Sequence, residues 1–202
     1  IHDFHHMSTS YTAGLRTGTI LEGELDEGQE FGNDYERSKV QAEQLVRSAD
    51  FLSPPTIYRP AIIVGDSQNG FTTTFHGFYA SLNLAYTLVK ALEQGAEQGT
   101  HPKTRLTLDG TERKNLIPVD WVSAVTTHIF TNRQFHGQTY HLTPTEAVTT
   151  ADIRHVLETA YGYGNSEFVG HGTTLDNPSE LEQLFYEHLK VYNSYWRDDP
   201  EF

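Results

Sequence analysis

The stretch from Thr56 to Val64 constrains the fold of this chain more than any other part of the sequence. It is almost continuously apolar and ends in a sharp exit at Gly65. A strand with one solvated face alternates apolar and polar residues, whereas an unbroken apolar strand is usually covered on both faces, as in a parallel sheet. Helical patterns occur on both sides of this stretch in the sequence and can provide the cover. We therefore expect an α/β fold with a mainly parallel sheet.

Apolar periodicity and capping residues predict the other elements. A short buried strand is expected at residues 3–9, and further strands at 105–108, 116–119 and 138–142. Three- and four-residue apolar steps predict helices at residues 33–48, 75–92, 121–130, 151–161 and 177–196. Four of these helices have a polar residue suited to an N-cap, namely Asn33, Asp120, Thr150 and Asn177.

Two of these helices carry more specific expectations. The first, capped by Asn33 with Glu36 in the reciprocal position of a capping box, should bury a stripe that consists of Val40, Leu45, Val46 and Ala49. The helix at 75–92 is rich in aromatic residues, which can either line a substrate pocket or pack in the core. Core packing is the more common role of such residues.

Tyr35 and Lys39 are the residues with the clearest chemical meaning. Four residues is about one helical turn, so both side chains lie on one face of the helix. A free tyrosine has a pKa of about 10 and is a poor acid–base catalyst at neutral pH, but a nearby cation favours the phenolate. Thr9 lies in a polar strand end, Ser8-Thr9-Ser10, and can share a substrate oxygen with Tyr35.

The surroundings of the pair matter because its spacing is not unique. The same Tyr-x-x-x-Lys pattern begins at Tyr86 and at Tyr186, where it lies in apolar helical stripes and indicates a core tyrosine with a surface lysine. Only the pattern at Tyr35 follows a Ser/Thr-rich strand end and precedes an apolar strand. The alternative for Tyr35 is a surface tyrosine in the first turn of a capped helix.

Five blocks, taken in order, resemble a known family. They are Ser8-Thr9-Ser10-Tyr11-Thr12-Ala13-Gly14, Tyr35-x-x-x-Lys39, Tyr58-Arg59-Pro60-x-x-x-Val64-Gly65-Asp66, Asn115-Leu116-Ile117-Pro118-Val119-Asp120 and Gly137-Gln138-Thr139-Tyr140-His141-Leu142. Over residues 4–160 the chain resembles the extended short-chain dehydrogenase/reductases of the NAD(P)-dependent epimerase/dehydratase superfamily, and most closely their thioester-reductase and fatty-acyl reductase branch. The resemblance implies Rossmann-like core pieces at residues 1–66 and 114–131, and a substrate-binding region at 67–113 and 132–202.

The resemblance also implies a chemistry, the reduction of an acyl thioester or related carbonyl with NADP or NAD as cofactor. Tyr35 would donate the proton, Lys39 would favour the phenolate and bind the nicotinamide ribose, and Thr9 would hydrogen-bond the carbonyl oxygen. The cofactor-binding residues implied are Ser8, Tyr35, Lys39, Pro60, Ala61 and Ile62. The hydride chemistry itself belongs to the cofactor. The substrate would be a small molecule or an acyl thioester, and a homodimer through the Tyr35 helix stays open.

One feature of the family is missing from the sequence, the glycine-rich turn that binds the dinucleotide pyrophosphate at a helix N-terminus. Gly162 and Gly164 lack a third glycine at the required spacing, so we expect a loop there. The chain also begins at Ile1 in what looks like a mid-sheet strand, and we expect the C-terminal part of a longer reductase. Alternatives are a nucleotide-sugar epimerase or dehydratase, and a non-catalytic fragment or interaction domain. Thr12-Ala13-Gly14, where epimerases often have Val-Tyr-Gly, favours the reductase.

Composition argues against several other classes. The net charge of -13 disfavours binding to nucleic acid or to an anionic membrane surface, and the absence of cysteine excludes a disulfide scaffold or thiolate metal site. No apolar run approaches the ~20 residues that a membrane span needs, and a cytoplasmic location is expected. The 11 histidines have no ligand-like spacing, and His5 and His6, as neighbours in a strand, point to opposite faces. We therefore expect no metal site.

Overall fold

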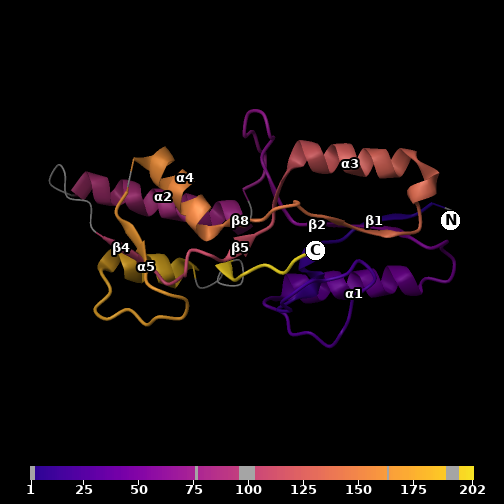
Figure 1. Cartoon of the computed structure of the whole chain (residues 1–202), viewed down its shortest axis with the longest axis horizontal. Helices are drawn as coiled ribbons and strands as arrows, with labels where there is room; N and C mark the ends of the chain where they lie inside the picture. The colour runs from indigo at the N-terminus through magenta and orange to yellow at the C-terminus, as the bar shows by residue number, and fades with distance from the viewer. Residues whose placement is uncertain (1–2, 76, 96–102, 163, 190–195) are drawn as a thin grey trace. The chain divides into compact units, whose positions relative to one another are not determined.

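The computed structural model describes residues 3–75, 77–95, 103–162, 164–189 and 196–202 (Figure 1). The chain forms two compact units. Unit 1 consists of Ile1–Thr73, Asn115–Ala147 and Asp199–Phe202. Unit 2 consists of Thr74–Lys114 and Val148–Asp198. The candidate catalytic residues, Thr9, Tyr35 and Lys39, all belong to unit 1.

Unit 1 is built around a three-stranded parallel sheet of order β1-β2-β7. Its strands are β1 (His5–Met7), β2 (Thr56–Pro60) and β7 (Thr139–Leu142). Every residue of the central strand β2 is buried, whereas β1 is shorter than expected and only partly buried. Figure 1 shows α1 (Asp34–Ser48) and α3 (Val119–Thr131) on opposite sides of this sheet. The expected α/β fold with parallel strands is confirmed.

The predicted strand at 56–64 is divided in two at Ala61. β3 (Ile62–Val64) leaves the first sheet and pairs in parallel with β6 (Leu116–Pro118). Ala61 N still donates to Leu142 O at 2.9 Å, and Ile62 N donates to Asn115 O at 3.1 Å, so the strand changes partner within one residue. The core of unit 1 includes residues from both halves of this strand and from its neighbours. It consists of Tyr58, Ala61, Ile117, Val122, Ile129 and Leu142.

The first helix, α1, has the bounds that its sequence predicts. Asn33 Oδ1 accepts a hydrogen bond from Glu36 N at 3.0 Å, and the Glu36 carboxylate accepts one from Gly32 N at 2.7 Å, which confirms the predicted N-cap. The predicted apolar stripe is wrong in part. Val40 is buried, but Leu45 is 72% exposed, and Glu43 takes a fully buried position instead.

The helix that follows β6 is not capped by Asp120 as expected. α3 begins at Val119 and its N-cap position is Pro118, which makes no side-chain capping bond. The Asp120 carboxylate accepts hydrogen bonds from the backbone and the hydroxyl of Ser67, at 2.9 and 2.7 Å. Asp120 therefore fixes the loop after β3, and hydrogen bonding to Ser67 holds the pKa of its carboxyl below the ordinary value. A short 3₁₀ helix, Arg133–Phe135, follows α3.

The caps of two helices in unit 2 also differ from the prediction by one or two residues. α4 (Thr150–Tyr161) is capped by Thr149, which forms a capping box with Asp152. α5 (Glu180–Leu189) follows Ser179, whose hydroxyl accepts from Glu182 N at 3.2 Å, so Asn177 lies before the helix. The predicted extension of this helix through residues 190–195 lies outside the described residues.

Unit 2 also contains α2 (Gly77–Gly95) and two small sheets. β4 (Thr104–Leu106) pairs in parallel with β9 (Ser166–Phe168), and β5 (Arg113–Lys114) pairs antiparallel with β8 (Val148–Thr149). The turn after the predicted strand at 105–108 requires Gly110, because φ is +87° there and a Cβ atom would lie 2.9 Å from the Phe168 ring. None of the helices in the described part of the chain has the length and apolar character of a membrane span.

Candidate active site

Tyr35 and Lys39 lie one helical turn apart on α1 and on the same face. Lys39 Nζ is 5.8 Å from the centroid of the Tyr35 ring, which is within the range of a cation–π contact. The Tyr35 side chain is 48% exposed on the surface of unit 1. This face of α1 therefore presents a phenol beside a positive charge, where a ligand can reach both.

Lys39 also connects α1 to the end of the first strand. Its Nζ donates a hydrogen bond to Met7 O at 3.3 Å, and Met7 is the last residue of β1. The next two residues, Ser8 and Thr9, are both buried. Since an ammonium has three N–H donors, the Met7 contact uses only one of them. Lys39 thus lies next to the strand end on which the candidate hydroxyl is found.

Thr9 is held in place from two sides. It is the N-cap of the 3₁₀ helix Ser10–Ala13, and its Oγ1 accepts from Tyr11 N at 3.3 Å. The same hydroxyl donates to Pro60 O at 3.4 Å, which is at the long end of hydrogen-bond distances. A hydroxyl hydrogen rotates to suit its surroundings. Thr9 can therefore turn its hydrogen from Pro60 to another acceptor without loss of the cap.

The backbone around Pro60 has its N–H groups engaged. Proline has no N–H, and the N–H groups of Ala61 and Ile62 donate to Leu142 O and Asn115 O, respectively. Ser8 N is also engaged, with Tyr58 O at 2.7 Å. The backbone around Pro60 can therefore offer a ligand carbonyl oxygens as hydrogen-bond acceptors. The structure brings Thr9 and Pro60 together, and these two residues, like Ala61 and Ile62, are buried.

A buried ion pair lies beside these residues and was missed by sequence reasoning. Arg59, which precedes Pro60, is 1% exposed, and its Nη2 and Nε bind the two carboxylate oxygens of Glu43 at 2.6 and 3.1 Å. Arg47 Nη2 adds a contact to the same carboxylate at 2.8 Å. Burial alone would raise the pKa of Glu43, but the hydrogen bonds and charge of Arg59 hold it below its ordinary value. Arg59 is a charged residue in the otherwise mostly apolar stretch Thr56–Val64. This was the sequence signal that could have revealed a buried ion pair.

His141 on β7 extends this ion pair. Its Nε2 lies 3.2 Å from Nη1 of Arg59, and its backbone N–H donates to the Glu22 carboxylate at 2.8 Å. Burial, together with the charge of Arg59, lowers the pKa of His141 from 6.5 to about 4. The imidazole is therefore neutral at pH 7, and its Nε2 accepts a hydrogen bond from the guanidinium.

Two further histidines, His5 and His6, lie on β1. His5 Nδ1 lies 2.9 Å from Tyr58 Oη, and burial lowers the pKa of His5. Burial also lowers the pKa of His6. In the part of the chain that the structure describes, no group of three or more His, Cys, Asp or Glu side chains is arranged to hold a metal ion.

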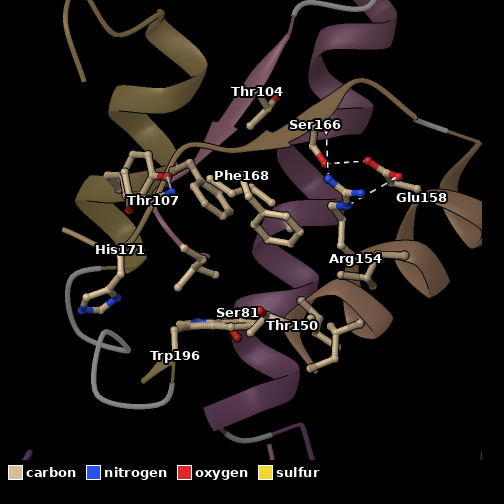
Figure 2. Close-up of a pocket in the computed structure, with 18 of the residues that line it drawn as sticks. Ser81, Thr104, Thr107, Thr150, Arg154, Glu158, Ser166, Phe168, His171 and Trp196 are labelled. Atoms are coloured by element: carbon tan, nitrogen blue, oxygen red, sulfur yellow. Dashed lines mark hydrogen bonds and ion pairs between the residues drawn. The ribbon is translucent and has the colours of Figure 1, made fainter. Parts of the chain in front are cut away.

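A second candidate site is a pocket within unit 2 (Figure 2). It has a volume of about 370 Å³ and is lined by α2, α4, α5, β4 and β9. α2 contributes Ser81, Leu82 and Ala85, none of them aromatic. The aromatic residues in the wall come from other elements and are Tyr161, Phe168, Phe185, Tyr186 and Trp196. The aromatic residues of the predicted helix at 75–92 thus do not line the pocket: Phe75 is exposed and lies before α2, and Phe78 within α2 is buried.

A parallel sheet between helices, with a tyrosine and a lysine beside the end of its first strand, defines unit 1 as a Rossmann-like α/β structure. A family model of NAD-binding proteins, described as "Male sterility protein", matches residues 1–126, and this chain belongs to that family. The resemblance to the thioester-reductase branch of the extended short-chain dehydrogenase/reductases is thereby confirmed.

Individual relatives agree with this assignment. The chain is 29% identical to "Aldehyde reductase lnbA" of Aspergillus flavus over 160 residues, which are 76% of this chain and 14% of that protein. A solved structure of the terminal R domain from the myxalamid PKS-NRPS biosynthetic pathway is 28% identical, with a TM-score of 0.63 over 94% of this chain and 46% of that chain. The chain therefore spans less than half the length of either relative.

A more distant neighbour bears on the fold alone. UDP-glucuronic acid 4-epimerase from Bacillus cereus, solved in complex with NAD, is 19% identical, with a TM-score of 0.57 over 96% of this chain and 62% of that chain. At this level of identity the likeness confirms the Rossmann-like fold and says nothing of the reaction.

Proposed function

We propose that this chain carries the catalytic tyrosine and lysine of a nicotinamide-dependent reductase that acts on an acyl thioester or related carbonyl. The single observation that supports this most is that Lys39 Nζ lies 5.8 Å from the Tyr35 ring and 3.3 Å from the carbonyl oxygen of Met7, two residues before Thr9. Two of its relatives, an aldehyde reductase and a terminal R domain, favour a reductase over an epimerase.

In this proposal, the residues of unit 1 donate the proton to the carbonyl oxygen and stabilise the negative charge that develops. When bound, the nicotinamide supplies the hydride, and NADPH and NADH are both compatible with these residues. Tyr35 Oη donates a proton to the carbonyl oxygen as negative charge develops there. The Lys39 ammonium stabilises the phenolate that remains. The Thr9 hydroxyl turns from Pro60 O toward the same oxygen and shares its charge.

The residues of this chain fit one end of the cofactor. Lys39 has donors for ribose hydroxyls, and the carbonyl oxygens near Pro60 can accept from a carboxamide. Residues 1–202 contain no Gly-x-Gly-x-x-Gly turn for a pyrophosphate. We assign the nicotinamide end of the cofactor and the carbonyl that is reduced to unit 1. The choice between NADP and NAD and the possible homodimer stay open, and the cytoplasmic location expected from the sequence stays a prediction.

Replacement of Tyr35 by Phe in the full-length reductase tests this proposal. The change removes the phenolic proton and keeps the ring, so kcat should fall by about 10²–10⁴-fold, the usual contribution of general acid catalysis. Tyr86→Phe, in the same Tyr-x-x-x-Lys spacing on α2, is the matched control and should leave kcat unchanged. Equal turnover by Tyr35→Phe and the parent enzyme would refute the proposed role.

A further inference from the structure

The segment Asp199–Phe202 belongs to unit 1 and is held there by its backbone. Both the N–H and the C=O of Glu201 bond to the backbone of residues 18–20, at 3.0 and 2.8 Å, in a parallel bridge. The carbonyl oxygen of Pro200 accepts a hydrogen bond from Asn115 Nδ2 at 3.0 Å. These bonds fix the two residues that follow the start of the segment, so the first side chain of the segment has a defined place.

That first side chain is the Asp199 carboxylate, which is buried and joins two parts of unit 1. Its Oδ2 accepts from Asn115 N, directly before β6, at 2.8 Å. The Tyr11 hydroxyl lies 3.4 and 3.3 Å from Oδ1 and Oδ2, so its hydrogen is shared between the two oxygens in a long contact. One carboxylate therefore connects the start of β6 to the 3₁₀ helix Ser10–Ala13.

These two contacts close a ring of bonds around the candidate catalytic hydroxyl. On one side of the ring, Tyr11 N donates to Thr9 Oγ1, and Thr9 Oγ1 donates to Pro60 O. On the other side, Asn115 O accepts from Ile62 N, two residues after Pro60, at 3.1 Å. The buried carboxylate is the link between the two sides. The place of the Thr9 hydroxyl relative to the backbone around Pro60 thus depends on it.

A buried carboxylate is an unfavourable group with which to join two backbone segments if stability alone matters. Its transfer from water to a protein interior costs free energy that hydrogen bonds and nearby charges must offset, and an apolar contact of similar size avoids that cost. What a carboxylate adds is direction, because its two oxygens accept hydrogen bonds from defined donors at defined distances. The choice of Asp199 at this position therefore favours a fixed geometry of the groups that it joins.

We propose that Asp199 is a positioning residue that fixes the Thr9 hydroxyl relative to the backbone around Pro60. This role rests on the proposed function, because the Thr9 hydroxyl is the group that would share the charge of the substrate oxygen. Asp199 itself acts through Tyr11, whose backbone N–H bonds to Thr9. It should therefore affect kcat more than KM, since a displaced hydroxyl no longer reaches the oxygen on which charge develops.

Replacement of Asp199 by Asn in the full-length reductase tests this role. The shape of the side chain is kept, but one acceptor oxygen becomes an N–H₂ donor, so the contact with either Asn115 N or Tyr11 Oη is lost. We expect kcat for carbonyl reduction to fall by about 10–10²-fold, and KM to change by less than about threefold. Tyr11→Phe removes one hydroxyl and keeps the carboxylate, and should lower kcat by about fivefold. It keeps the test open if Asp199→Asn does not fold.

The matched control is the preceding carboxylate, Asp198, which binds the Arg113 guanidinium at 3.0 Å on the surface. Asp198→Asn makes the same chemical change one residue away and should leave kcat unchanged. Unchanged kcat in both Asp199→Asn and Tyr11→Phe would overturn the proposal.

A double-mutant cycle with Thr9→Val separates positioning from a general loss of structure. Once the Thr9 hydroxyl is absent there is nothing left to position, so Asp199→Asn should then lower kcat by less than about twofold. A merely structural role would lower kcat by the same factor with and without the hydroxyl. That result would refute the proposed role of Asp199.

Amide hydrogen exchange in residues 1–202 measures the ring of bonds without the reaction. Asp199→Asn should raise the exchange rates of the Tyr11 and Asn115 N–H groups by about tenfold or more, because both groups bond within the ring. The Ile57 N–H, which donates to Gln138 O in the sheet, should keep its rate. Unchanged rates at both Tyr11 and Asn115 would overturn the proposal.

The two proposals can fail separately. A full-length protein that reduces no thioester or aldehyde would refute the reductase, and the exchange rates would then decide whether Asp199 fixes the place of Thr9. Normal turnover by the parent, with equal kcat for Asp199→Asn and Asp198→Asn, would keep the reductase and refute the role of Asp199.

Discussion

At the scale of single residues, Lys39 acts through two neighbours, the Tyr35 ring and the Met7 carbonyl. A carbonyl oxygen carries only a partial charge, so it orients the ammonium without neutralising it. The full charge stays available to a phenolate one helical turn away. Lys39 therefore has a different role from Arg59, whose charge is neutralised by Glu43 in the core.

Replacement of Lys39 by Met should show how much the positive charge of Lys39 contributes to catalysis. If the proposed reductase activity holds, kcat/KM should fall by about 10²-fold, because the electrostatic stabilisation of the phenolate is lost. The measurement is kcat/KM for carbonyl reduction by the variant and the parent.

The matched control for this prediction lies on α2. Lys90 Nζ is 5.6 Å from the centroid of the Tyr86 ring, close to the 5.8 Å between Lys39 Nζ and the Tyr35 ring. Lys90→Met should leave kcat/KM unchanged. Equal values of kcat/KM for Lys39→Met and Lys90→Met would count against the proposed electrostatic role of Lys39.

At the scale of helices and strands, the sequence predicts those features that depend on residues nearby in the chain, such as helix bounds and caps. The bounds of α1 follow from Asn33, Glu36 and the apolar spacing, all of which lie within or next to the helix. The cap of α4 was misplaced by one residue because Thr149 and Thr150 are adjacent. Asp152, three residues after Thr149, was the local signal that distinguishes them, since it completes a capping box.

Features that depend on distant partners could not be predicted in this way. Glu43 is buried because Arg59, 16 residues further along the chain, neutralises it, and no periodicity within α1 indicates this. Likewise the strand at 56–64 changes partner at Ala61 because β6 and β7 pair with different halves of it. Thr9, Tyr35 and Lys39 became candidates because a short sequence motif points to them. The order of helices and strands alone does not.

The ion pair between α1 and β2 predicts a large effect on stability. Glu43→Gln removes the negative charge and leaves the Arg59 guanidinium buried beside a neutral amide, which should lower the free energy of unfolding by about 3 kcal/mol. Urea unfolding of the chain, followed by circular dichroism, measures this difference. The exposed pair of Lys103 and Glu167 provides the control, and Glu167→Gln should change the free energy of unfolding by less than about 1 kcal/mol. Equal effects of the two substitutions would contradict the prediction.

At the scale of the whole molecule, two properties weaken cofactor binding: the negative net charge and the absence of a glycine-rich turn from the sequence. The chain has a net charge of -13, and a dinucleotide is itself an anion, so general electrostatics oppose binding. Backbone N–H groups at a helix N-terminus would normally offset this for the pyrophosphate, but the sequence has no glycine-rich turn for that purpose. Residues 1–202 should therefore contact only the nicotinamide and its ribose.

This reasoning predicts that NADPH and reduced nicotinamide mononucleotide bind this chain with similar affinities, within about threefold, because the adenosine half of NADPH finds no partner. Isothermal titration of each ligand into the chain measures the two Kd values. Lys39→Met should weaken both by the same factor, since Lys39 is assigned to the ribose that the ligands share. NADPH that binds more than tenfold tighter than the mononucleotide would contradict the prediction, because it would require a pyrophosphate or adenosine site within these 202 residues.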